Sequence, residues 1–181
     1  MNERQVDKQV VFTGKKVRLE LHHVREEDGR KHTREVVVHP GAVVILPILP
    51  DGRILLIRNY RPTVGEYLIE LPAGTLEPGE SPRNCAGREL VEETNFAAGK
   101  LTWLASFYSS PGILTEKLHA FVATKLTPEQ GTPDVGEHIQ PHPLTFDEAM
   151  DAVQHGQITD GKTIATLLYY EKFGEKSGEK K

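Results

Sequence analysis

The sequence of 181 residues contains one cysteine, Cys85, so no disulfide can form within a single chain. Disulfides are typical of secreted domains, and their absence predicts a reducing compartment, the cytoplasm. No apolar run approaches the roughly 20 residues that a membrane-spanning helix requires. The first residues, MNERQVDKQ, lack the apolar stretch of a signal peptide. We therefore expect neither a disulfide framework nor a membrane anchor.

Positive charge does not exceed negative charge. The chain has 22 Lys and Arg against 26 Asp and Glu, a net charge of −4, which argues against a nucleic-acid-binding surface. The eight histidines show no metal-ligand spacing, and there is neither a glycine-rich P-loop nor a serine elbow. The composition, 38% apolar and 27% charged, is that of an ordinary globular protein with one main domain.

Residues 74–96, GTLEPGESPRNCAGRELVEETNF, hold the most informative pattern in the chain. Ser81 is a good N-cap with a proline directly after it, and Asn95 tolerates the left-handed conformation of a helix C-cap. These residues predict a helix from about Pro82 to Thr94. Cys85 falls inside that helix, and we interpret it as a small buried residue rather than a nucleophile.

Acidic residues crowd one face of this predicted helix. Glu89 and Glu93 are i,i+4 neighbours, Glu92 lies beside them, and Glu80 precedes the helix. Like charges at this spacing repel, and they lie toward the negative end of the helix dipole. The unfavourable arrangement indicates a site for a hard divalent cation such as Mg2+. An acidic helix face exposed to solvent would show the same pattern.

The spacing of these residues resembles the Nudix box. In that pattern a glycine is followed after five residues by a glutamate, and after seven more by Arg-Glu, two residues and Glu-Glu, as in Gly74, Glu80 and residues 88–93. Asn95 stands where the family has glycine, and Phe96 replaces the final aliphatic residue. The resemblance covers roughly residues 40–170 and implies the Nudix fold, an α/β architecture with a mixed β-sheet between helices.

The patterns of strand-forming residues divide the chain into three parts. Residues 1–39 predict a small N-terminal antiparallel sheet, residues 40–173 the Nudix hydrolase domain, and residues 174–181 a disordered tail. The run AVVILPIL predicts a strand that is buried on both faces. Further strands are predicted in RILLIRNYR, YLIELPAG, LTWLASFYSS and KLHAFVAT.

Two more helices are expected near the C-terminus. One spans residues 144–154, where Thr145 and Glu148 form a capping box, and the other spans about residues 162–173. Residues 128–136 predict a polar, turn-rich loop.

Features outside the box resemble the ADP-ribose pyrophosphatase group of the Nudix family. Pro111 lies fifteen residues past Phe96, residues 110–116 look like the catalytic loop of that group, and residues 34–42 look like the start of its core. A plain turn between strands would also explain the Pro-Gly pair. The resemblance implies hydrolysis of a nucleoside diphosphate sugar, with ADP-ribose cleaved to AMP and ribose 5-phosphate.

The same resemblance assigns residues to the reaction. Glu116 is the expected general base, and Arg88 is expected to pair with Glu80 or a neighbour and so to orient the cluster. Mg2+ is the expected cofactor, with Mn2+ as a substitute. The expected metal ligands are the backbone carbonyl of Ala73 and the carboxylates of Glu89, Glu92 and Glu93.

Four residues are implied to bind the substrate: Arg34, Arg61, Glu70 and Glu137. The planar guanidinium of Arg61 suits a phosphate, although a solvent-exposed cation at the end of a strand gives the same sequence. Arg34 would reach the nucleobase from a partner subunit, because the group forms homodimers with exchanged N-terminal sheets. Residues 10–39 alone bury too little to be stable, which agrees with a partner.

Two alternative functions remain open from the sequence. The box does not separate ADP-ribose from another substrate such as a GDP-sugar, because base selectivity lies in the shape of the pocket. A non-catalytic Nudix module that binds a nucleotide sugar usually lacks one of the box acids, and all four acids are present here.

Overall fold

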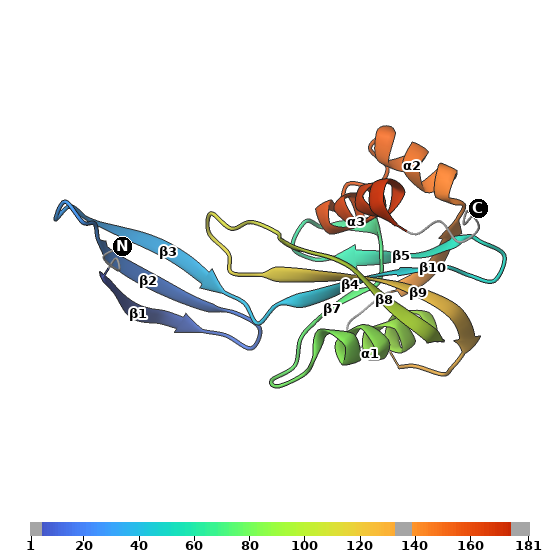
Figure 1. Ribbon diagram of the computed structural model, residues 1–181, viewed down its shortest axis with the longest axis horizontal. Helices are drawn as coiled ribbons and strands as arrows, with labels where there is room; N and C mark the ends of the chain where they lie inside the picture. The colour runs from blue at the N-terminus through green and yellow to red at the C-terminus, as the bar shows by residue number, and fades with distance from the viewer. Residues whose placement is uncertain (1–4, 133–138, 175–181) are drawn as a thin grey trace.

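A computed structural model describes residues 5–132 and 139–174 as a body of sheets and helices from which an N-terminal sheet projects (Figure 1). Glu137 and the predicted tail at 175–181 lie outside the described residues. The strands are β1 Gln5–Thr13, β2 Arg18–Arg25, β3 Lys31–Val38, β4 Ala42–Pro47, β5 Ile54–Arg61, β6 Glu66–Glu70, β7 Ala73–Thr75, β8 Phe96–Tyr108, β9 Lys117–Pro128 and β10 Ile139–Leu144. The helices are α1 Pro82–Thr94, α2 Phe146–Gln154 and α3 Gly161–Phe173.

Strand β4 forms the centre of the body and is buried along its whole length, as predicted. It pairs in parallel with β9 and antiparallel with β7 in a mixed sheet of order β7-β4-β9-β8, while β10, β5 and β6 form a second, antiparallel sheet. Successive side chains of a strand point to opposite faces. Val43 and Ile45 therefore pack against α1, and Val44 and Leu46 pack in the core that includes α2 and α3.

Helices cover both faces of these sheets, with α1 on one side and α2 and α3 on the other (Figure 1). The predicted mixed sheet between helices is confirmed, with the strands of the body divided over two sheets. None of the helices that the structure describes is long and apolar enough to cross a membrane. Cys85 is fully buried on the inner face of α1, and burial raises the pKa of its thiol to about 12, as suits a packing residue.

Helix α1 begins and ends at the predicted residues. The Ser81 hydroxyl accepts a hydrogen bond from the backbone N–H of Asn84 at 3.3 Å, and Asn95 closes the helix at φ 60°. The Asn95 side chain also accepts the N–H of Gly131 at 2.9 Å. Gly131 lies so close to the Val91 carbonyl that no Cβ would fit. Asparagine thus keeps the left-handed cap of the usual glycine and adds a bond that glycine cannot make.

The C-terminal part differs from the prediction in one added strand and in the start of one helix, since α2 begins at Phe146 and not at residue 144, which ends β10. The capping box of Thr145 and Glu148 is present at the start of α2. Strand β10, however, was not expected, because Pro141 and Pro143 interrupt any strand pattern. Proline has no backbone N–H to donate. The strand still forms because β10 lies at the edge of its sheet, and no strand on its outer side needs that donor.

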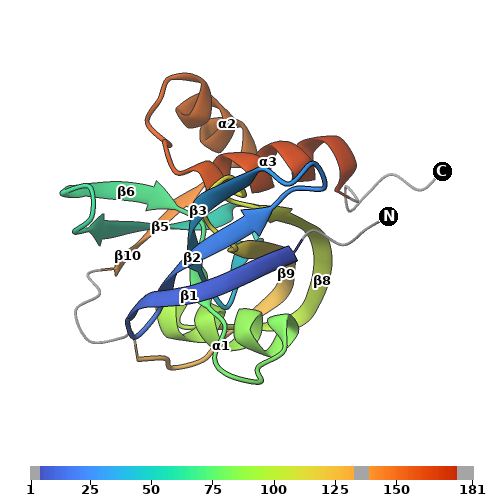
Figure 2. The ribbon, with the colours of Figure 1, turned by 90° about the vertical axis from the view of Figure 1, so that its left-hand side faces the viewer.

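The N-terminal sheet, of order β1-β2-β3, is antiparallel as predicted, and its first strand begins at Gln5. Figure 2, in which this sheet faces the viewer, shows it lying across one end of the body. Val6, Val10, Val11 and Phe12 of β1 are exposed, Phe12 by 58%. The sheet therefore presents apolar surface that the single chain does not cover.

Candidate active site

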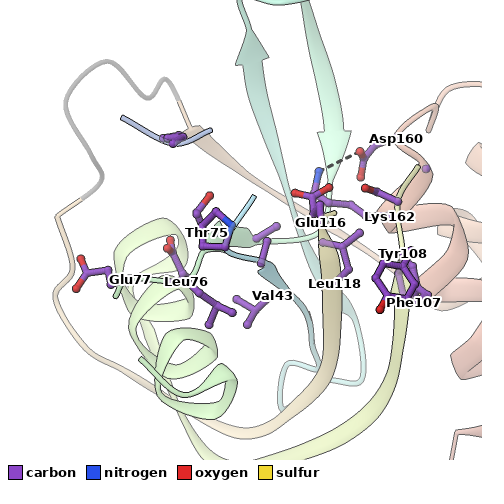
Figure 3. A pocket seen from close by; sticks show the side chains of 18 of the residues that line it. Val43, Thr75, Leu76, Glu77, Phe107, Tyr108, Glu116, Leu118, Asp160 and Lys162 are labelled. Atoms are coloured by element: carbon purple, nitrogen blue, oxygen red, sulfur yellow. Dashed lines mark ion pairs between the residues drawn. The ribbon is translucent and has the colours of Figure 1, made fainter. Parts of the chain in front are cut away.

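A cleft of about 1160 Å³ is lined by residues of the body and by Lys15 and Lys16 of the N-terminal sheet's first turn. Figure 3 shows part of this lining from close by. One wall is formed by β7 and α1, and the opposite wall by the β8–β9 loop and the start of α3. The sequence-predicted residues that line the cleft are Arg61, Ala73, Arg88, Glu89, Glu92 and Glu116, whereas the predicted Glu70 and Glu93 are buried and are not among its lining residues. Residues not predicted also line it, among them Lys15, Lys16, Tyr108, Asp160 and Lys162.

Strand β7 and helix α1 are joined by the acids of the helix. Glu93 is buried, and its Oε2 accepts the backbone N–H of Ala73 at 2.9 Å. The Glu89 carboxyl lies directly against Gly74, where an added Cβ would overlap it. A larger residue at position 74 would therefore force the Glu89 carboxyl to move from its place against β7.

Arg88 pairs with three of the acids around it and offsets part of their charge. Its Nη1 donates to Glu89 Oε1 and to Glu92 Oε2, each at 2.8 Å, and its Nε and Nη2 donate to the two oxygens of Glu80 at 3.0 Å. The predicted pair of Arg88 and Glu80 is therefore present. The Arg88 hydrogen bonds lower the pKa of Glu80 from 4.5 to about 2, and the same contacts raise the pKa of Arg88.

The donor set on α1 suits a hard divalent cation. Carboxylate oxygens are the ligands that such cations prefer, and Glu89 and Glu92 converge on one positive group, the Arg88 guanidinium. Within residues 5–132 and 139–174, no group of three or more His, Cys, Asp or Glu side chains is already gathered around one point. A cation would therefore need the carboxylates to turn away from Arg88 and toward the cleft.

The other wall contains a buried ion network. Arg61 donates two hydrogen bonds to Glu70, at 2.8 and 2.6 Å, and Lys162 donates to Glu70 at 2.6 Å. Burial by itself would raise the pKa of Glu70, but the hydrogen bonds from Arg61 and Lys162 outweigh it and lower the pKa. Lys162 also pairs with Asp160, the N-cap of α3, at 3.0 Å.

Glu70 positions the two cations of this network. Its side chain is fully buried behind Arg61 and Lys162, so it holds the two cations at the wall of the cleft. Lys162 and Asp160 were missed by sequence reasoning. Their Asp-x-Lys spacing at a helix start is visible in the sequence, but nothing local connects it to Glu70, which lies 92 positions from Lys162.

The remaining predicted residues lie apart from each other. Glu116 lines the cleft from the β8–β9 loop, on the side of Lys162 and Asp160 (Figure 3). Arg34 is exposed on β3 and is not among the residues that line the cleft of its own chain. Glu137, the fourth predicted substrate residue, lies outside the described residues.

Comparison with known proteins gives consistent matches over this fold. The family model "NUDIX domain" matches residues 38–167. An ADP-ribose pyrophosphatase of Bacillus subtilis (strain 168) is 35% identical over 173 residues, which cover 94% of each chain. A GDP-mannose pyrophosphatase of Yersinia enterocolitica is 38% identical over 143 residues, 74% of each chain. A crystal structure of an ADP compounds hydrolase matches with a TM-score of 0.84 and 25% identity over 95% of this chain and 94% of the other.

The ion pair of Glu80 and Arg88 predicts how stability depends on pH. We expect Glu80→Gln to lower the free energy of unfolding by about 1 kcal/mol at pH 7, as for a partly exposed charged hydrogen bond. Because the folded-state pKa is lowered, the difference from wild type should be full above pH 4.5 and shrink as pH falls toward 2. Urea titrations at several pH values measure it. Exposed Glu129 supplies the control, Glu129→Gln, and an equal, pH-independent loss in both variants would contradict the prediction.

Proposed function

The chain belongs to the NUDIX domain family, and from this premise we propose that it hydrolyses the diphosphate bridge of nucleoside diphosphate sugars, with ADP-ribose as the preferred substrate. One observation carries the proposal: a single cleft is lined by acids of α1, by Glu116 and by the cation Lys162. Relatives named for ADP-ribose and GDP-mannose support a nucleotide sugar as the substrate class.

The two walls suit the two needs of this reaction. A diphosphate carries negative charge that repels a nucleophile, and Arg61 and Lys162 present two fixed cationic hydrogen-bond donors where the cleft is lined by β5 and α3. Mg2+, with Mn2+ as a substitute, held by Glu89, Glu92, Glu93 and the Ala73 carbonyl, would neutralise the diphosphate and lower the pKa of a bound water.

Glu116 is proposed as the general base. As the water oxygen bonds to phosphorus, the Glu116 carboxylate takes the proton of the water, and the bridging oxygen leaves with the other phosphate. Arg88 keeps Glu89 and Glu92 together, and Glu93 keeps β7 against the helix. In this scheme the acids of α1 would hold the metal ion, and Glu116 of the β8–β9 loop removes the proton.

A second substrate, a GDP-sugar, is supported by the similarity to the Yersinia GDP-mannose pyrophosphatase. A binding module without activity is less well supported, because Glu80, Glu89, Glu92 and Glu93 are all present around the cleft wall formed by β7 and α1. We also propose a cytoplasmic location, which rests on the single cysteine.

The proposed activity is tested by incubating the purified protein and Mg2+ with a panel of nucleotide sugars and dinucleotides. We expect the highest kcat/KM for ADP-ribose, with AMP and ribose 5-phosphate as the products, and hydrolysis in 18O-water identifies the phosphate that is attacked. A preference for GDP-mannose would favour the second substrate. Tight binding without turnover of any compound would favour the binding module.

Two glutamine variants separate metal holding from proton transfer. Glu93→Gln should lower kcat by orders of magnitude and raise the Mg2+ concentration needed for half-maximal rate, since the carboxylate holds metal. Glu116→Gln should lower kcat by about 10²–10⁴ while KM and the Mg2+ requirement stay near wild type. Steady-state kinetics across Mg2+ concentrations, with circular dichroism as the folding control, measure both. Near-normal turnover in either variant would refute the role given to that residue.

We further propose that residues 1–39 form a dimerising segment and that residues 40–173 form the hydrolase domain. The exposed apolar residues of β1 support a homodimer with exchanged N-terminal sheets, in which Arg34 reaches the cleft of the partner. Sedimentation velocity should report a dimer, and Phe12→Asp should shift it toward monomer and raise KM. A fully active monomer of the wild-type chain would contradict the proposal.

A further inference from the structure

We propose that residues 37–39, where β3 leaves the N-terminal sheet, position the Glu116 carboxylate, and that Thr115 and His39 are positioning residues for the reaction. The inference rests on the proposed role of Glu116 as the base. Figure 1 shows the β8–β9 loop, in yellow, at the end of the body from which the N-terminal sheet projects. The loop and β3 lie far apart in sequence and meet beside the cleft.

The backbone of the loop is bonded to β3 as a short additional strand would be. Val37 N–H donates to the carbonyl of Ile113 at 2.8 Å, and Thr115 N–H donates to the carbonyl of Val37 at 3.0 Å. Val37 and Leu114 form a parallel bridge. Because Val37 both donates and accepts, Thr115, the residue directly before Glu116, is attached to β3, while the Glu116 carbonyl accepts the N–H of Ser109 after β8 at 3.4 Å.

The side chain of Thr115 adds a second attachment. Its hydroxyl accepts the backbone N–H of His39 at 2.9 Å and donates to the carbonyl of His39 at 3.3 Å. A hydroxyl can do both, whereas a methyl group of the same size can do neither. Thr115 therefore bonds to β3 and the segment after it through its backbone and its side chain together.

The His39 ring lies between this attachment and the base. Its Nδ1 accepts the backbone N–H of Gly41 at 3.1 Å and lies 3.6 Å from Glu116 Oε1. One nitrogen serves only one of these partners, and the shorter contact, to Gly41, fits hydrogen-bond geometry while the longer does not. The ring is thus anchored by Gly41 and limits where the Glu116 carboxylate can lie.

Gly41 makes this anchor rigid. Its φ of +103° is one that other residues rarely adopt, and an added Cβ would meet Leu76 Cδ1 at 3.1 Å and the Lys117 carbonyl at 3.2 Å. A general base must lie within about 3 Å of the proton that it removes, so displacement of a loop by about 1 Å is enough to slow the reaction. Residues 37–41 supply the rigidity that a surface loop lacks.

Thr115→Val against Thr115→Ser tests the inference, because valine keeps the shape and removes the hydroxyl while serine keeps the hydroxyl. We expect Thr115→Val to lower kcat for ADP-ribose at least tenfold, with KM and the Mg2+ requirement near wild type, and Thr115→Ser to retain most of the activity. His39→Asn, which keeps an acceptor near the Nδ1 position, should be far more active than His39→Leu. Melting temperatures show whether each variant is folded.

The decisive measurement places Thr115→Val in the Glu116→Gln background. If Thr115 acts through Glu116, the valine should cause little further loss of kcat there. An equal loss in both backgrounds would show a merely structural role and overturn the inference. If Thr115→Val keeps the wild-type kcat while Glu116→Gln loses activity, the positioning role of Thr115 is overturned and the base role of Glu116 stands. Unchanged kcat in Glu116→Gln would overturn the proposed base, and the inference with it.

Discussion

Repulsion among the acids of α1 is the constraint on which the rest of the site depends. Glu89, Glu92 and Glu93 lie at the end of the helix where its dipole is negative, so both the dipole and their mutual repulsion disfavour them. The structure compensates from two directions. Arg88 neutralises Glu89 and Glu92, and the Ala73 N–H stabilises Glu93. These contacts bring β7 against the helix and so create one wall of the cleft.

That wall is stable because β4 is buried on both faces. Its alternate side chains belong to two separate apolar cores, one under α1 and one with α2 and α3, so both layers of helices are fixed relative to the same strand. β7 pairs with β4, and β9 pairs with β4 on its other side. β7 of the first wall and β9, which follows Glu116, therefore flank the same buried strand, and close packing around that strand fixes the distance between them.

In the second wall the repulsion is between two cations, not between carboxylates. Arg61 and Lys162 would repel each other in a partly buried site, and the fully buried Glu70 between them removes this repulsion. A carboxylate at that depth is stable only because two cations donate to it. The charges of this second wall are thus paired within the protein, and a phosphorylated ligand would meet cations there whose positions are already fixed.

The sequence by itself determined the elements whose cause is local. Ser81 and Asn95 predicted both ends of α1, the apolar run predicted β4, and the spacing of the acids predicted the family and its wall of carboxylates. Each of these depends on residues within a few positions, which is the range over which caps, periodicity and charge patterns act.

Only the tertiary structure decided the contacts between distant segments. Lys162 reaches Glu70 across 92 positions, and Thr115 reaches His39 across 76. Strand β10 forms despite two prolines because it lies at a sheet edge, and Asn95 meets Gly131 because the chain returns past the end of α1. Such contacts arise from how the layers pack, and no local pattern records which segments that packing brings together.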